Sequence, residues 1–266
     1  MGLLLAVVLA GGSLLAGAQE HLRMSTTTST ENSGLLKSLL PAFEAQCKCK
    51  VDVIAVGTGK ALKIAEMGDV DMVFVHARKL EEAFVASGFG VNRRDVMYND
   101  FVILGPSNDP TKVKQAKSAA EALKRISDAQ ATFISRGDES GTHQKEKELW
   151  QSAGVQPSGA WYRSAGQGMG EVIMMATEQK AYALADRGTY SAFKHSKTDL
   201  HILFQNEKGL FNPYGVIAVN PKKHPGVKYD LAMQFINFVT SKEGQNIIAA
   251  YRVGGEPIFF VTGAKK

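Results

Sequence analysis

The sequence predicts an α/β protein with two lobes, each an open sheet flanked by helices, and two crossover strands that join them. Three observations predict this fold class. Short apolar runs alternate with helical patterns in the first half of the chain, the alternation recurs in the second half, and two extended runs end at proline. With 266 residues and 44% apolar composition, the chain can bury a core of this size.

Two strands and two helices predict the first lobe. Residues 50–56 and 70–77 are short, β-branched and bounded by turn residues, as buried strands are. Residues 34–46 have an apolar helical face with a kink expected at Pro41, and residues 59–68 have near-helical apolar spacing that stops at a glycine. This order indicates an open parallel sheet. The apolar helical positions are Leu35, Leu36, Leu39, Leu40 and Phe43, then Leu62, Ala65 and Met67.

The second lobe repeats the pattern. Residues 130–137 and 180–188 are interpreted as strands that each run into a polar, glycine-containing loop. Residues 143–154 and 170–181 are the intervening helices.

The crossover strands are predicted within residues 99–110 and 212–225, where an apolar strand ends at proline in each case. A C-terminal helix over residues 230–251 would then return to the first lobe, and the two lobes would enclose a cleft. The predicted divisions are 19–101 for the first part of lobe 1, 102–212 for lobe 2, and 213–266 for the return to lobe 1.

The first residues of the chain predict an export signal. They are uncharged and apolar and end in the triplet Ala16-Gly17-Ala18, the kind of small-x-small site that signal peptidase cuts. Residues 1–18 are therefore interpreted as a removed signal peptide, with the mature chain beginning near Gln19. An uncleaved membrane anchor is the alternative, which the glycines in this short apolar run disfavour.

Charge and cysteine content exclude several classes of protein. The net charge is +5, and the basic residues are scattered without interleaved aromatics, so no nucleic-acid partner is expected and a small anion fits better. The two cysteines, Cys47 and Cys49, cannot supply a disulfide framework. Because a zinc site would need further ligands nearby, we expect a polar turn that carries two thiols, with a strained small ring as an alternative.

Six consecutive hydroxyl residues, Ser25 through Thr30, stand near the start of the mature chain. Ligands of open α/β sheets bind at the carboxyl ends of strands, where helix N-termini present free N–H groups and hydroxyls add donors. The next strand ends in Gly57-Thr58-Gly59, where glycine lets backbone amides approach a ligand. Both loops suit an anion. Ordinary N-capping, which uses one or two of the six hydroxyls, is the alternative for the first loop.

The segment "SRGDESGTH" (135–143) lies between a predicted strand and a predicted helix. Arg136 offers a fork of donors, and Asp138 can pair with it and hold its orientation. Ser140, Gly141 and Thr142 then stand at the start of the helix as hydroxyl and amide donors. One cation with many neutral donors suits an oxyanion, whereas a surface ion pair of little consequence is the alternative.

These segments resemble the periplasmic tungstate-binding proteins of ABC importers, which are relatives of the molybdate and phosphate binders. The resemblance covers nearly all of the mature chain. It rests on "TTTST" (26–30), "VGTGKAL" (56–62), "GFGVNRRDVMYNDFVILGP" (88–106), "SRGDESGTH" (135–143), "GQGMG" (166–170), "DRGTY" (186–190) and "FNPYGVIAVNP" (211–221). The sequence departs from the family at "AQCKCK", where relatives carry a glycine-containing turn, away from the predicted site.

The resemblance implies a type II periplasmic-binding-protein fold that captures tungstate between its lobes and delivers it to a transmembrane permease. A periplasmic monomer without catalytic activity, cofactor or metal is expected. The family's oxyanion ligands correspond to Thr27, Thr28, Ser29 and Arg136, and similarity to the phosphate-binder loop adds Ser140, Gly141 and Thr142. The loop argument adds Thr58 as a ligand, with Gly57 and Asp138 in support.

Other ligands and a catalytic role are the alternatives. Phosphate carries a proton at neutral pH and needs a carboxylate acceptor, which the first-lobe loops lack, so it is disfavoured unless Asp138 accepts that proton. Tungstate, molybdate and sulfate need no such acceptor, and the residues do not separate tungstate from molybdate. A hydrolase that uses Ser140 is the enzymatic alternative, but "GDESG" lacks the small-residue turn of G-x-S-x-G.

Three further residues stand near the predicted cleft without an assigned contact to the ligand. His76 and His143 are expected to be hydrogen-bonded packing residues. Arg187 is expected to form a structural pair with Asp186.

Overall fold

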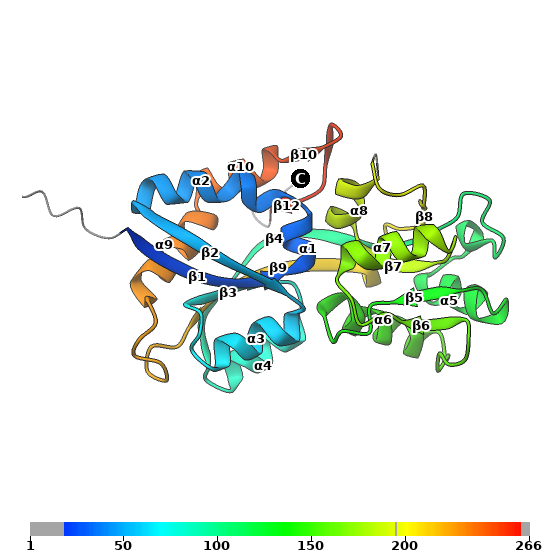
Figure 1. Ribbon diagram of the computed structural model, residues 1–266, viewed down its shortest axis with the longest axis horizontal. Helices are drawn as coiled ribbons and strands as arrows, with labels where there is room; N and C mark the ends of the chain where they lie inside the picture. The colour runs from blue at the N-terminus through cyan, green and yellow to red at the C-terminus, as the bar shows by residue number, and fades with distance from the viewer. Residues whose placement is uncertain (1–18, 195, 262–266) are drawn as a thin grey trace, which may run out of the picture.

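The computed structural model describes residues 19–194 and 196–261, which form two α/β lobes joined by two long strands (Figure 1). The predicted signal peptide, residues 1–18, lies outside the described residues. None of the helices in the two described ranges combines the length and apolar character that crossing a membrane requires.

Lobe 1 is built on a mixed sheet. Strands β1 (Glu20–Thr27), β2 (Cys49–Val56) and β3 (Met72–Val75) run parallel, as predicted, and β1 lies in the middle of the three. Strand β9 (Phe211–Val219) pairs antiparallel with β3, and β4 (Gly90–Gly105) pairs antiparallel with β9. The sheet is therefore parallel only in its first half.

Helices cover both faces of this sheet (Figure 1). Helices α2 (Leu35–Cys47) and α9 (Tyr229–Val239) pack on one face, and α3 (Thr58–Glu66) and α4 (Arg78–Ala86) on the other. Helix α2 runs without a break through Pro41 and buries Leu35, Leu36, Leu39 and Phe43, with Leu40 partly buried. The short helix α1 (Thr28–Asn32) follows β1 directly.

Two details of lobe 1 differ from the prediction. Met67 is the C-cap residue of α3 and is 55% exposed, because it follows the buried Ala65 by two residues and so lies about 200° around the helix from it. The C-terminal segment forms two helices, α9 and α10 (Lys242–Ala250), so the single predicted helix is wrong. Ser241 begins the second helix by accepting a hydrogen bond from Gly244 N at 3.3 Å, an N-cap inside the apolar pattern.

Lobe 2 packs short strands between four helices. The strands are β5 (Phe133–Ser135), β6 (Tyr162–Ser164), β7 (Ala183–Asp186) and β8 (His201–Phe204). The helices are α5 (Ala119–Asp128), α6 (Gly141–Ser152), α7 (Met169–Glu178) and α8 (Arg187–Phe193), with the 3₁₀ turns η1 (Val113–Gln115) and η2 (Lys208–Leu210). Apolar clusters fill both faces of the strands.

Strand β4 belongs to both lobes. It pairs with β9 as far as Asp100, opposite Phe211, and from Phe101 onward it pairs with β7 and β8. The predicted lobe divisions at 101/102 and 212/213 stand next to this change of partner. The described residues end on lobe 1 with the short strands β10 (Arg252–Val253), β11 (Glu256–Pro257) and β12 (Phe260–Val261), the last of which pairs with β4.

Cys47 and Cys49 form a disulfide. It links the last residue of α2 to the first residue of β2, and Cys49 is buried in the core of lobe 1. The predicted polar turn with free thiols is therefore wrong, and the small ring is right. Lys48 between them adopts a left-handed backbone conformation, φ 53°, which brings the two sulfurs together.

Candidate functional site

The six hydroxyls of the N-terminal run divide into two groups. Ser25 Oγ donates to Ala61 O at 3.0 Å, and Thr26 Oγ1 donates to Phe74 O at 2.6 Å. Thr27 caps α1, because its Oγ1 accepts from Thr30 N at 3.1 Å, and the two threonine hydroxyls lie 2.8 Å apart. The capping alternative thus accounts for Thr27 and Thr30.

The remaining two hydroxyls, of Thr28 and Ser29, face Arg136 from lobe 2. Arg136 Nη2 lies 3.3 Å from Thr28 Oγ1, and Nη1 lies 3.4 Å from Ser29 Oγ. Arg136 follows β5 directly, as predicted, so it points from the carboxyl end of a strand into the space between the lobes.

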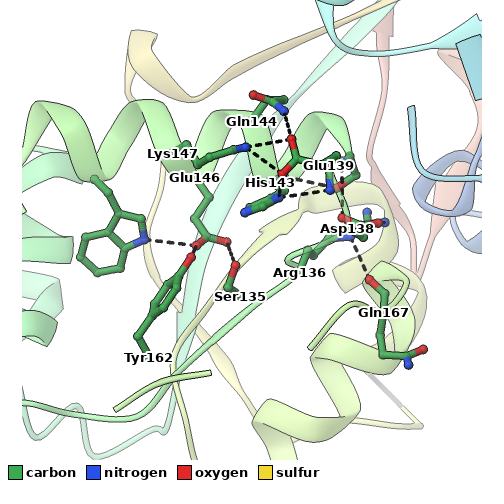
Figure 2. A network of polar contacts seen from close by, with 12 residues as sticks. Ser135, Arg136, Asp138, Glu139, His143, Gln144, Glu146, Lys147, Tyr162 and Gln167 are labelled. Atoms are coloured by element: carbon green, nitrogen blue, oxygen red, sulfur yellow. Dashed lines mark hydrogen bonds and ion pairs between the residues drawn. The ribbon is translucent and has the colours of Figure 1, made fainter. Parts of the chain in front are cut away.

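Arg136 is buried. Residues of its own lobe hold its side chain (Figure 2). The side chain is 1% exposed, its Nη2 pairs with the carboxylate of Asp138, and its Nε donates to Gln167 O at 3.3 Å. Burial lowers the pKa of Arg136, and the Asp138 carboxylate opposes that effect. The surface ion-pair alternative is therefore wrong. A guanidinium desolvated in this way can bind an anion strongly, because the anion replaces the hydrogen bonds to water that the guanidinium has lost.

The N-terminus of α6 adds neutral donors. Ser140 caps the helix by accepting from His143 N at 3.2 Å, and Gly141 N approaches Thr58 Oγ1 from lobe 1 at 3.3 Å. Thr142 Oγ1 is buried and makes no hydrogen bond, one of two such side-chain atoms in the described part of the chain. An unpartnered buried hydroxyl is costly, and a polar ligand at this helix terminus would satisfy it.

Gly57 permits the close approach of the two loops. A Cβ built on Gly57 would lie 3.1 Å from Asp138 Oδ2 and 3.3 Å from its carbonyl oxygen. The predicted site residues therefore come from both lobes, and the hydroxyls of Thr27 and Ser140 each cap a helix of their own lobe.

A buried carboxylate that the sequence analysis did not single out lies beneath the loop of Arg136 and Asp138. Glu146 on α6 accepts hydrogen bonds from Ser135 Oγ at 2.9 Å, Tyr162 Oη at 2.8 Å and Trp150 Nε1 at 3.2 Å (Figure 2). Burial raises its pKa to about 7. The spacing of Glu146 and Trp150, one helical turn apart, is the signal that could have placed Glu146 on the buried face.

The three unassigned residues have protein partners. His76 is buried, with Nε2 3.0 Å from Thr27 Oγ1 and Nδ1 2.9 Å from Asn212 Oδ1. His143 Nδ1 accepts from Glu139 N at 3.1 Å. Both are the hydrogen-bonded packing residues that the sequence predicts.

The predicted Asp186–Arg187 pair is wrong. Arg187 pairs with Asp100, with Nη2 2.7 Å from Oδ2, while Asp186 caps α8 through Thr189 N at 2.8 Å. The two side chains separate because Asp186 ends a strand and Arg187 begins a helix. Within the described ranges, no cluster of three or more His, Cys, Asp or Glu side chains could hold a metal ion.

Two α/β lobes on two crossover strands, with polar side chains of both lobes facing one another, define the architecture of a substrate-binding protein. The chain belongs to the PBP superfamily, because the model of the PBP superfamily domain matches residues 15–243.

Named relatives extend the comparison. The tungstate-binding protein TupA of Peptoclostridium acidaminophilum is 46% identical over 252 residues, which cover 93% of this chain and 88% of that protein. The crystal structure of the tungstate ABC transporter from Geobacter sulfurreducens is similar with a TM-score of 0.82 and 69% identity, covering 87% of this chain and 99% of that one. The tungstate-binding protein TupA from Desulfovibrio alaskensis has a TM-score of 0.75 and 44% identity, covering 91% and 98%.

Proposed function

We propose that this protein binds tungstate between its lobes and delivers it to the permease of an ABC importer. The observation that carries the proposal is the convergence of one buried cation, Arg136, with the hydroxyls of Thr28 and Ser29 from the opposite lobe. Thr58, Ser140, Gly141 and Thr142 complete the proposed donor set. Thr27 acts in this proposal as the cap that orients the Thr28–Ser29 turn, and Gly57 and Asp138 act in support.

The donor set favours a fully deprotonated tetrahedral oxyanion. A protonated anion such as hydrogen phosphate needs an acceptor in the site, and Asp138 is the nearest carboxylate to Arg136. Its Oδ2 pairs with Arg136, and its Oδ1 accepts from Ser140 N at 3.2 Å. Both oxygens of Asp138 are therefore already used by protein donors and do not serve as acceptors for a proton of the ligand. This disfavours phosphate. Tungstate is chosen over molybdate and sulfate because the relatives are named for tungstate.

A binding role fits the local geometry better than hydrolysis. Ser140 Oγ accepts from a backbone N–H, and the ring of His143 accepts from Glu139 N, so these two side chains are not arranged as a nucleophile and its base. The membership in a substrate-binding superfamily supports the same conclusion. We further propose that the protein works as an extracytoplasmic monomer without a cofactor, as the resemblance to importer components implies.

Isothermal titration calorimetry with tungstate, molybdate, sulfate and phosphate tests the proposal. We expect tungstate to bind tightly, phosphate to give no measurable heat, and Arg136→Ala to weaken tungstate by about 2–5 kcal/mol, as truncation of a desolvated charge pair does. Arg163→Ala, at an exposed arginine of the same lobe, is the matched control and should bind as the wild type does. The proposal would be refuted if wild-type protein did not bind tungstate, or if the Arg136→Ala variant bound tungstate with wild-type affinity.

A further inference from the structure

A chain of buried polar groups runs from the crossover strands to the hydroxyl turn. We call it the hinge chain, and it consists of Asp186, Asn99, Asn212, His76 and Thr27. All five side chains are buried, with exposed fractions of 4% or less. Asp186 ends β7 in lobe 2, Asn99 and Asn212 lie on the crossover strands β4 and β9, and His76 and Thr27 follow or end strands of lobe 1. The hinge chain therefore spans the junction between the lobes.

Asp186 holds both crossover strands. Its Oδ2 accepts from Asn99 Nδ2 at 2.8 Å, Asn212 Nδ2 at 3.1 Å and Tyr214 Oη at 2.8 Å. Its Oδ1 accepts from Thr189 N in lobe 2 at 2.8 Å. No lysine, arginine or histidine within the described residues forms an ion pair with this carboxylate, which is satisfied by hydrogen bonds from neutral groups.

The carboxylate determines the direction of every hydrogen bond further along. Since a carboxylate oxygen only accepts, Asn212 must turn its NH₂ group toward Asp186 and its Oδ1 toward His76. His76 Nδ1, 2.9 Å away, must then carry the proton. Burial lowers the pKa of His76 and keeps the ring neutral, so Nε2 bears a lone pair.

Thr27 completes the order. Its hydroxyl, 3.0 Å from the bare Nε2, must donate to His76. The oxygen of that hydroxyl then accepts from Thr30 N at 3.1 Å and from the Thr30 hydroxyl at 2.8 Å. These bonds fix the first turn of α1, which carries Thr28 and Ser29 toward Arg136.

We infer that His76 is a positioning residue of the anion site, oriented by Asp186 through Asn212, so that the junction between the lobes sets the geometry of the Thr28–Ser29 turn. The inference rests on the proposed function, because the turn matters only if it contacts the ligand. A rotation of lobe 2 that moves Asp186 releases Asn212, and the hydrogen-bond order that holds Thr27 is lost with it. The relative orientation of the lobes is thereby coupled to the position of the Thr28 and Ser29 hydroxyls.

Calorimetry on three histidine variants tests the inference. His76→Leu removes both hydrogen bonds, and we expect tungstate to bind about 10- to 100-fold more weakly, by analogy with the loss of residues that orient the ligands of a metal ion. His76→Gln can donate to Asn212 and accept from Thr27 at once, so it should recover most of the affinity. His201→Leu, at an exposed histidine on β8, is the matched control and should bind normally.

The outcomes separate the inference from the proposed function. If wild-type protein does not bind tungstate, the proposed function fails. If wild-type protein binds tungstate, Arg136→Ala binds it more weakly, and a folded His76→Leu binds it as tightly as wild type, the proposed function stands and the inference is overturned.

Nitrogen-15 NMR of the ligand-free protein gives a readout that does not depend on the folding of a His76 variant. We expect His76 to be protonated at Nδ1 and bare at Nε2 in the wild type. In Asp186→Asn, an amide can present either a donor or an acceptor to Asn212, so we expect the proton of His76 to populate Nε2 as well. A wild-type ring protonated at Nε2, or an Asp186→Asn spectrum identical to the wild type, would overturn the inference.

Discussion

Buried hydroxyls at this site differ in whether the protein itself satisfies them. Thr26 Oγ1 donates to Phe74 O at 2.6 Å, whereas Thr142 Oγ1 is buried without a partner. Replacing the first removes a hydrogen bond that stabilises the fold, and replacing the second removes a polar group whose burial costs free energy. The two threonines should therefore respond in opposite ways to the same change.

Thr142→Val should weaken tungstate binding by about 1 kcal/mol and leave the free energy of unfolding unchanged or slightly higher, since it deletes an unsatisfied hydroxyl and keeps the shape. Thr26→Val is the matched control, for which we expect lower stability. Calorimetry and urea unfolding of both variants check this. A Thr142→Val protein with lower stability and unchanged affinity would mean that the hydroxyl contacts protein, not ligand.

The charge of Glu146 makes stability depend on pH. Burial raises its pKa from 4.5 to about 7, so the folded protein binds a proton more tightly than the unfolded chain. A raised folded-state pKa contributes stability that is complete below the unfolded value and is lost as the pH rises through about 7. A pKa difference of this size contributes on the order of 3 kcal/mol to the free energy of unfolding at low pH.

Glu146→Gln should remove this dependence, because glutamine resembles the protonated acid and does not titrate. Between pH 5 and pH 8, we expect wild-type stability to fall relative to Glu146→Gln by about 2–3 kcal/mol. Glu139→Gln is the control, because the pKa of Glu139 is lowered by Lys147 and its charge stays constant over that interval. Urea unfolding at both pH values measures the difference, and parallel curves for wild type and Glu146→Gln would contradict it.

Residue-scale reasoning from the sequence succeeds where the partners are close in the chain. Arg136, Asp138 and Thr142 lie in one short segment, from the end of β5 to the first turn of α6, so their placement could be predicted together. The role of His76 could not, because its partner Asn212 is 136 residues away and meets it only through the pairing of β3 with β9. Glu146 is an intermediate case, because the spacing to Trp150 marks its buried face, whereas its contact with Tyr162 comes from a separate strand 16 residues further on.

At the scale of elements, apolar periodicity locates most helices and strands but not their partners. The parallel strands β1, β2 and β3 follow from alternation with helices, whereas the antiparallel pairing of β9 with β3 and β4 joins segments far apart in sequence. The break between α9 and α10 was missed because their apolar pattern is continuous and the interruption is a local cap at Ser241. Local polar geometry thus limits what periodicity can predict.

The disulfide between α2 and β2 should stabilise these elements without affecting the site. It closes a ring of only three residues, so the loop-entropy relation gives about 1–2 kcal/mol. Strand β2 runs from Cys49 to Val56, so the disulfide and Gly57 lie at opposite ends of the strand. We expect reductant to lower the free energy of unfolding by this amount, measured by urea unfolding. A parallel loss of tungstate affinity would show that the disulfide reaches the site.

For the whole molecule, a set of direct contacts between the lobes, which we call the seam, holds them together. Thr189 Oγ1 in lobe 2 lies 3.3 Å from Ser29 O in lobe 1, and Lys79 on α4 forms an ion pair with Glu148 on α6 at 2.5 Å. The contacts of Arg136 with the hydroxyl turn lie in the same seam. Because the two halves of the proposed site are on different lobes, ligand binding and lobe closure should be linked.

Gly141 tests that linkage, because it lies where α6 of lobe 2 meets lobe 1. A Cβ at this position would lie 2.9 Å from His76 O, 3.2 Å from Ala77 Cβ and 3.3 Å from Thr58 Oγ1, and the first of these is a backbone atom that cannot easily move. The conformation of Gly141 is that of an ordinary helix residue, and alanine is favoured over glycine within helices. The substitution should therefore destabilise the contact of α6 with lobe 1 that this structure shows, without destabilising the fold of lobe 2.

For Gly141→Ala we expect unchanged or slightly higher thermal stability, weaker tungstate binding, and a smaller decrease in the radius of gyration when tungstate is added, measured by small-angle X-ray scattering. Gly226→Ala is the matched control, because a Cβ at Gly226 meets nothing within 4 Å. It should compact as the wild type does. If Gly141→Ala compacts fully and binds tungstate normally, then the seam in this structure is not the contact that closes on the ligand.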